Sequence, residues 1–89
     1  MSTVFIALQA NEATRPIIDA ILADNPEATI KRDPAMVKIN APGHLVIRRS
    51  SIEEQTGASF DLQELQVNLI TLSGNVDETE DELTLHWNN

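Results

Sequence analysis

Cysteine and tyrosine are missing from this 89-residue sequence, and other aromatic residues are scarce. Without cysteine the chain can form no disulfide, and it offers no thiolate to zinc, to an iron–sulfur cluster or to a substrate. The whole aromatic supply is Phe5, Phe60 and Trp87. These scattered rings are too few for a platform that stacks the bases of a nucleic acid.

Segments that would send the chain into a membrane are also absent from the sequence. No apolar run approaches the roughly 20 residues that span a bilayer. The start of the chain carries no basic run, and the apolar run at 4–8 is too short for the core of a signal peptide. We therefore expect a cytoplasmic protein that binds neither a membrane nor a nucleic acid.

The charges are unevenly divided along the chain, which carries a formal net charge of −8. All basic residues lie before position 50, and they are Arg15, Lys31, Arg32, Lys38, Arg48 and Arg49. The rest of the chain holds only acidic residues, namely Glu53, Glu54, Asp61, Glu64, Asp77, Glu78, Glu80, Asp81 and Glu82. An acidic half of this kind repels nucleic acid and anionic lipid, and it attracts a basic protein surface. Plain solubility of a small protein explains the charge equally well.

Apolar periodicity predicts a strand, a helix, three strands, two short helices and two strands, in that order. The expected strands are 4–8, 28–32, 36–41, 45–49, 66–72 and 83–87. The first of these is apolar throughout, which is typical of a central strand buried on both faces. Asn11 is the expected N-cap of the first helix, and Asn25 with Pro26 ends that helix.

Capping signals mark the two short helices. Ser50 and Ser51 each stand three residues before a Glu, which predicts a capping box, and Gly57 is a natural residue to end that helix. Asp61 and Glu64 repeat the signal for one further helical turn.

The order of elements indicates an α+β fold in a single domain over residues 1–89. Two strand–helix–strand units place short helices against an antiparallel or mixed sheet. We expect a hairpin of 36–41 with 45–49 around Pro42 and Gly43, and an acidic loop at 73–82. Whether the strands form one sheet or two stays open.

The sequence contains no recognisable motif for catalysis, metal binding or phosphate binding. His44 and His86 are isolated, no Glu is followed three residues later by His, and the glycines are too far apart to cradle a phosphate. Oxygen ligands alternate at 75–81 as in a calcium loop, but Glu80 occupies the position that requires Gly. We therefore expect no catalytic, cofactor-binding or metal-binding residues, and a role in binding.

The strand predicted at 66–72 contains a break in its alternation. Leu65, Val67 and Leu69 share one face, whereas Ile70 and Leu72 fall on the face of Asn68, where polar residues are expected. Either a bulge shifts the phase of the strand, or a second element covers this face, or the strand presents apolar groups to a partner.

Several segments carry a resemblance to a known family. They are VFIALQ at 4–9, AILADNP at 20–26, DPAMVKI at 33–39, IRR at 47–49 and ITLSGNVDE at 70–78. In this order, over nearly the whole chain, they resemble the regulatory component of bacterial multicomponent phenol hydroxylases. That family includes component B of soluble methane monooxygenase and the toluene monooxygenase effector proteins.

The resemblance implies a cofactor-free effector protein. It would bind the di-iron hydroxylase component of the same system and promote coupled hydroxylation of phenol to catechol, while a separate reductase supplies electrons from NADH. In the methane relative, the strand that matches 68–72 faces the hydroxylase, although small polar residues stand there in place of Ile70 and Leu72. The candidate partner-binding residues are therefore Asn68, Ile70, Leu72, Ser73, Gly74, Asn75, Val76 and Asp77.

Two other functions stay open on the sequence. An acidic adaptor or nucleic-acid mimic would block a basic groove, but its acids should be spaced like phosphates, and here they cluster at 77–82. A ferredoxin-like domain that binds a small ligand should show a pocket with convergent polar groups.

Overall fold

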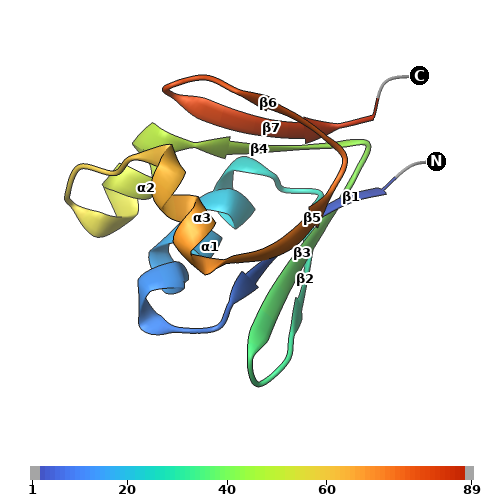
Figure 1. The fold of residues 1–89 in the computed structure, drawn as a ribbon, viewed down its shortest axis with the longest axis horizontal. Coiled ribbons are helices and arrows are strands. Elements are labelled where there is room, and N and C mark those ends of the chain that lie inside the picture. The colour runs from blue at the N-terminus through green and yellow to red at the C-terminus, as the bar shows by residue number, and fades with distance from the viewer. Residues whose placement is uncertain (1–2, 88–89) are drawn as a thin grey trace.

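The computed structural model describes residues 3–87, which fold into two antiparallel sheets with helices between them (Figure 1). The strands are β1 (Thr3–Gln9), β2 (Thr29–Arg32), β3 (Met36–Pro42), β4 (His44–Arg48), β5 (Leu69–Ser73), β6 (Asn75–Glu78) and β7 (Glu82–His86). The helices are α1 (Arg15–Asp24), α2 (Arg49–Thr56) and α3 (Leu65–Asn68), with 3₁₀ turns η1 (Glu12–Thr14) and η2 (Leu62–Glu64). This confirms the α+β class and answers the open question of one sheet or two.

The larger sheet has the strand order β2-β3-β1-β5, so β1 lies inside it, as predicted. Val4, Ile6 and Leu8 alternate along β1 and are fully buried. Ile6 lies opposite Ile39 of β3 on one side and Leu72 of β5 on the other. Because successive side chains point to opposite faces, this alternation commits one whole face of the sheet to the core.

The smaller sheet has the order β4-β7-β6. Leu45 pairs with Leu85 and Ile47 pairs with Leu83 across β4 and β7, and all four side chains are buried. The strand predicted at 83–87 is therefore present as β7, with Leu83 and Leu85 on its buried face, whereas Trp87 lies beyond its end and is 38% exposed. Figure 1 shows the two sheets diverging, with the helices filling the open side between them.

Helix α1 closes the core through Ile17, Ile18, Ala20 and Ile21, which are all buried. The helix ends at Asp24, as the Asn-Pro pair predicts. Asn11 caps the preceding turn η1 and not α1 itself, through a reciprocal capping box with Thr14.

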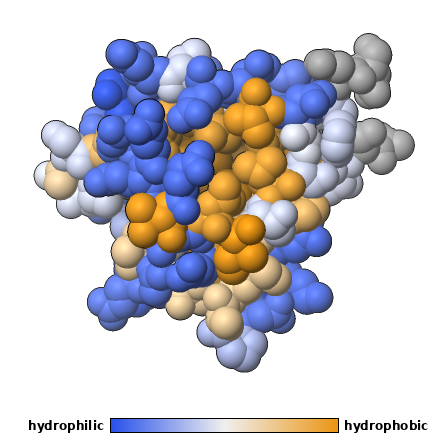
Figure 2. All heavy atoms as spheres, viewed as in Figure 1, coloured by the Kyte–Doolittle hydropathy of each residue, from blue (hydrophilic) through white to orange (hydrophobic). Residues whose placement is uncertain are grey.

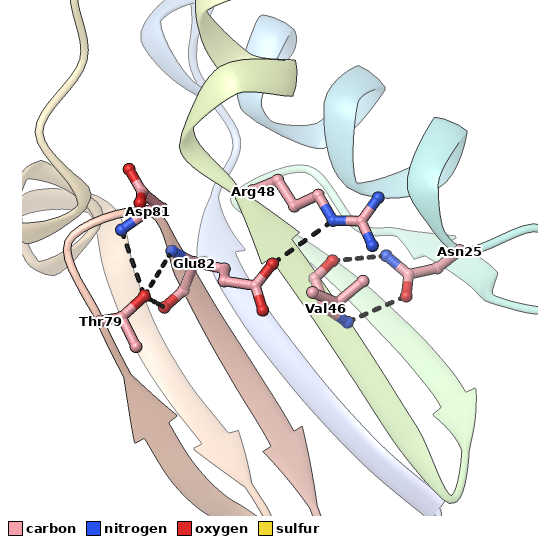
Figure 3. Close-up of polar contacts among 6 residues, drawn as sticks. All are labelled: Asn25, Val46, Arg48, Thr79, Asp81 and Glu82. Carbon is pink, nitrogen blue, oxygen red and sulfur yellow. Dashed lines mark hydrogen bonds and ion pairs between the residues drawn. The ribbon is translucent and has the colours of Figure 1, made fainter.

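Asn25 protects the free edge of β4. Its buried side chain accepts a hydrogen bond from the backbone N–H of Val46 at 2.9 Å and donates to the Val46 carbonyl at 2.7 Å (Figure 3). The carboxamide thus takes the place of a neighbouring strand residue, and it covers backbone groups that would otherwise be open to pairing with another chain.

The hairpin predicted around Pro42 and Gly43 is wrong. Both edges of β3 are already paired, with β1 and with β2, so the chain passes Gly43 and continues into the other sheet as β4. The hairpin instead joins β2 to β3 across a turn at Asp33, whose N–H donates to the Met36 carbonyl at 2.8 Å.

The capping predictions for the short helices had different outcomes. Helix α2 begins at Arg49, one residue before the predicted serine caps, and its N-cap residue Arg48 makes no side-chain capping bond. Gly57 ends the helix in the left-handed conformation, as predicted. The capping box of Asp61 and Glu64 is present at η2.

Candidate partner interface

The segment 62–68 folds as a helix where the sequence pattern predicted a strand from residue 66. The capping box at Asp61 starts η2, which leads directly into α3. Leu62 and Leu65, three residues apart, are buried on the side that faces the core. Val67 lies off this stripe and is 74% exposed, so the predicted common face of Leu65, Val67 and Leu69 is wrong.

The broken alternation after Leu69 is caused by a bulge. Across β1 and β5, Ala7 pairs with Thr71 and Leu8 with Leu69, which leaves Ile70 without a partner. Ile70 is 47% exposed, whereas Leu72 lies opposite Ile6 and packs against the core. Of the explanations left open by the sequence, the bulge is therefore the one that the structure shows. The extra residue reverses the phase of the strand, so Leu72 does not share the outward face of Ile70.

Gly74 joins the two sheets between β5 and β6. Its φ of 131° is one that residues with a side chain rarely adopt. A Cβ atom at this position would lie 3.0 Å from Cγ1 of Val4 and 3.4 Å from the carbonyl oxygen of His86. Only glycine lets the chain pass this close to β1 and β7 and continue as an edge strand of the second sheet.

Residues 75–78, predicted as a loop, form the strand β6, and all four are exposed. Together β5 and β6 present a continuous edge of two sheets, beside α3. This surface carries Val67, Ile70 and Val76, which are 74%, 47% and 45% exposed and which we call the apolar ridge. Figure 2 shows hydrophobic atoms gathered over the face where Figure 1 draws α3, β5 and β6. These exposed apolar groups make the surface a candidate for binding a partner.

The other predicted site residues lie in the same region. Asn75 and Asp77 are exposed on β6, and Asn68, Ser73 and Gly74 are half-buried. The structure thus brings the predicted set together along one path over α3, β5 and β6, with Leu72 beneath it. Val67 is the neighbour that sequence reasoning missed. The helical spacing of Leu62 and Leu65 after the capping box was the signal that could have found it.

The β6–β7 turn is a structured hairpin end. The hydroxyl oxygen of Thr79 accepts the backbone N–H groups of Asp81 and Glu82 at 3.2 and 3.1 Å (Figure 3). Asp81 pairs with Arg49 at 2.7 Å, and Glu82 pairs with Arg48 at 3.5 Å. These contacts fix the hairpin to the start of α2.

Not all acids of the hairpin are compensated. Asp77 contacts His86, but Glu78 and Glu80 have no ion-pair partner among residues 3–87. Both line a shallow groove between the hairpin, Arg49 and Glu53 of α2, and η2. Five acidic side chains and one basic side chain line this groove. The charged lining residues are Arg49, Glu53, Asp61, Glu64, Glu78 and Glu80. The surface beside the apolar ridge is therefore strongly negative.

Within residues 3–87 no three histidine, aspartate or glutamate side chains come together in a way that could hold a metal ion. None of the helices in that range is long and apolar enough to cross a membrane.

This fold and surface define a small binding protein whose edge strands present an apolar ridge next to an acidic groove. The chain belongs to the MmoB/DmpM family, whose family model matches residues 2–86. It is 46% identical over 88 residues to the stimulatory component DmpM of phenol 2-monooxygenase from Pseudomonas sp. strain CF600. That match covers 99% of this chain and 98% of the relative.

Two solved structures share the fold. A chain in the structure of a phenol hydroxylase–regulatory protein complex superposes with a TM-score of 0.94 at 42% identity, covering 98% of this chain and 100% of that one. The regulatory protein B of soluble methane monooxygenase superposes with a TM-score of 0.76 at 20% identity, covering 97% of this chain and 65% of that one. The second likeness shows the fold alone.

Proposed function

We propose that this chain is the regulatory component of a multicomponent phenol hydroxylase. It binds the hydroxylase component and promotes coupled hydroxylation of phenol to catechol. The observation that carries this function is the match of 46% identity to the stimulatory component of phenol 2-monooxygenase, which extends over nearly the whole of both chains. The superposition on a chain of a phenol hydroxylase–regulatory protein complex supports the same partner.

The docking surface that we propose is the path over α3, β5 and β6. Val67, Ile70 and Val76 supply apolar contact area, and the partner covers them on binding. A buried aliphatic anchor of this kind contributes about 1–3 kcal/mol to an interface. Asn68, Ser73, Gly74, Asn75 and Asp77 supply polar and backbone contacts around it, and Leu72 supports the path from the core side.

The regulatory effect follows from selective binding. A protein that does no chemistry itself can change another protein only by binding one of its conformations more tightly than another. We infer that the chain acts without catalysing any step, as one domain over residues 1–89, and that it stabilises the hydroxylase conformation that couples electron use to hydroxylation.

The resemblance to the family supplies the rest of the system. The hydroxylase would hold the di-iron centre, and a reductase would deliver electrons from NADH. Because NADH is a cytoplasmic reductant, we propose that the chain works in the cytoplasm.

The rival function as an acidic mimic is disfavoured by the hairpin. Asp77, Asp81 and Glu82 are each in contact with a basic or histidine side chain of the same chain. A mimic needs its acids free and evenly spaced for a basic partner.

The test of the proposed function is reconstitution from purified components. Hydroxylase and reductase are mixed with phenol and NADH, with and without this chain, and catechol formed per NADH consumed is measured. We expect the chain to raise both the rate and this ratio, and to form no catechol alone. Equal rate and equal coupling without the chain would overturn the proposal.

A further inference from the structure

Asn11 joins two distant parts of the chain through its side chain. Its Oδ1 accepts the backbone N–H of Thr14 at 3.1 Å, and its Nδ2 donates to Oδ1 of Asn68 at 2.9 Å. Asn68 is the last residue of α3 and stands two residues before the bulge at Ile70. This single bond therefore ties the proposed docking surface to the connection between β1 and α1.

The base of this link is held firmly. Thr14 is fully buried, and its hydroxyl donates to the Gln9 carbonyl at 2.7 Å. The same hydroxyl oxygen accepts the backbone N–H of Asn11 at 3.3 Å, which completes a reciprocal capping box. Thr14 thus holds Asn11 through both its backbone and its side chain, and the Thr14 hydroxyl anchors this pair to the end of β1.

The donor and acceptor roles in the hydrogen bonds from Thr14 through Asn11 to Asn68 are set by one unambiguous donor. A backbone N–H can only donate, so the Thr14 amide requires the oxygen of the Asn11 carboxamide. The Nδ2 atom of Asn11 must then point to Asn68, and Oδ1 of Asn68 must accept the hydrogen bond. The donors of Asn68 Nδ2 are left over, and no hydrogen bond within residues 3–87 uses them.

We propose that Asn11 is a positioning residue that fixes the polarity of the Asn68 carboxamide, so that Asn68 offers amide donors to an oxygen acceptor on the hydroxylase. This inference rests on the proposed function and its docking surface. Asn68 follows Val67 directly in the chain and precedes Ile70 by two residues, and both of these apolar residues are exposed. When a partner covers these and excludes water, an amide donor without an acceptor becomes costly, so the partner supplies one.

The variant Asn11→Asp tests polarity without removing the link. Aspartate is as good an N-cap as asparagine, so η1 should form and the melting temperature should stay near wild type. The aspartate, however, presents an oxygen to Asn68 where the wild type presents N–H. The Asn68 carboxamide should turn over, donate inward and show its oxygen to the partner. We expect hydroxylase binding to weaken about ten-fold, the effect of one lost hydrogen bond.

The variant Asn11→Ser is the matched control. Serine keeps the cap but is too short to reach Asn68, so the Asn68 carboxamide is free to present either end. We expect an intermediate affinity, giving the order wild type, then Asn11→Ser, then Asn11→Asp. A link that merely tethers α3 gives the reverse order of the two variants, because aspartate preserves the tether and serine breaks it.

The reversal can also be seen without the hydroxylase. In ¹⁵N-labelled protein, the side-chain NH₂ protons of Asn68 should exchange rapidly with solvent in the wild type and more slowly in Asn11→Asp. Unchanged exchange, or Asn11→Asp binding as tightly as wild type, would overturn the inference and leave the proposed function intact. Failure of the wild-type chain itself to bind the hydroxylase would overturn the proposed function instead.

Discussion

The strands β1 and β5 are neighbours in one sheet, yet they are built in different ways. Strand β1 lies between β3 and β5, runs without interruption from Thr3 to Gln9, and buries Val4, Ile6 and Leu8 on one face. Strand β5 is an edge, is shorter, contains a bulge, and begins directly at the end of a helix. The interior strand is fixed by pairing on both sides, whereas the edge strand is free to bend outward and present Ile70. The first strand contributes stability, and we propose that the second takes part in recognition.

The largest effect should come from truncating the interior strand. Ile6 is buried between Ile39 and Leu72, and Ile6→Ala leaves a cavity there. We expect a loss of about 2–5 kcal/mol in the free energy of unfolding, measured by chemical denaturation. The same truncation at Ile70 should cost under about 1 kcal/mol, because its side chain is half exposed. Equal losses at the two positions would contradict the distinction between the strands.

This contrast also explains how much of the fold could be predicted. The apolar run of β1, the end of α1 at Asn25 and the end of α2 at Gly57 are local signals that packing reinforces, and they correctly predict an interior strand and two helix ends. The hairpin around Gly43 was mispredicted because no local signal reveals that both edges of β3 are already taken.

The candidate site was harder to predict because it lies at an edge. Alternation is enforced where a face is buried, and it fails where a bulge is tolerated, so parity misplaced Leu72. Val67 was misplaced because its neighbours also fit a strand pattern, and only the capping box at Asp61 pointed to a helix. The link from Asn11 to Asn68 joins residues far apart in sequence, which no spacing rule can find.

A second, smaller loss of stability is expected where the two sheets meet. A Cβ at Gly74 would approach Val4 to 3.0 Å, whereas one at Gly43 would meet nothing within 4 Å. Both residues have positive φ, so Gly74→Ala and Gly43→Ala share the backbone strain of about 1–3 kcal/mol, and only Gly74→Ala adds a clash. Thermal unfolding should place Gly74→Ala lower. If Gly43→Ala melts at the same temperature or below, the close approach at Gly74 is not a constraint on the fold.

Variants of Leu72 and Ile70 distinguish effects on folding from effects on binding within β5. Leu72→Ala should lower the free energy of unfolding by about 2 kcal/mol or more, because the side chain packs against the core. Ile70→Ala should keep the melting temperature near wild type and weaken hydroxylase binding by about 1–3 kcal/mol. Titration of the hydroxylase and thermal melts of both variants provide the measurement. A stable Leu72→Ala that loses binding would place Leu72 on the docking surface after all.

The smallest effect should come from the uncompensated acids of the hairpin. The double variant Glu78→Gln/Glu80→Gln removes two negative charges that have no ion-pair partner within residues 3–87. The control Asp81→Asn/Glu82→Gln removes two negative charges that are paired with Arg49 and Arg48. We expect the first pair to slow association with the hydroxylase at low salt by a few-fold, and the difference to vanish as salt screens the charges over roughly 8–10 Å. Stopped-flow association rates across salt concentrations measure this. Rates that are equal at all salt concentrations would show that the hairpin plays no part in steering.

The most direct test of the proposed docking surface is amide hydrogen exchange of this chain, free and bound to the hydroxylase. The amides of α3, β5 and β6 should gain protection in the complex, because the partner covers this edge. The amides of β2, the opposite edge of the same sheet, should exchange as fast as in the free protein. Protection gained at β2 with none at residues 67–78 would contradict the account.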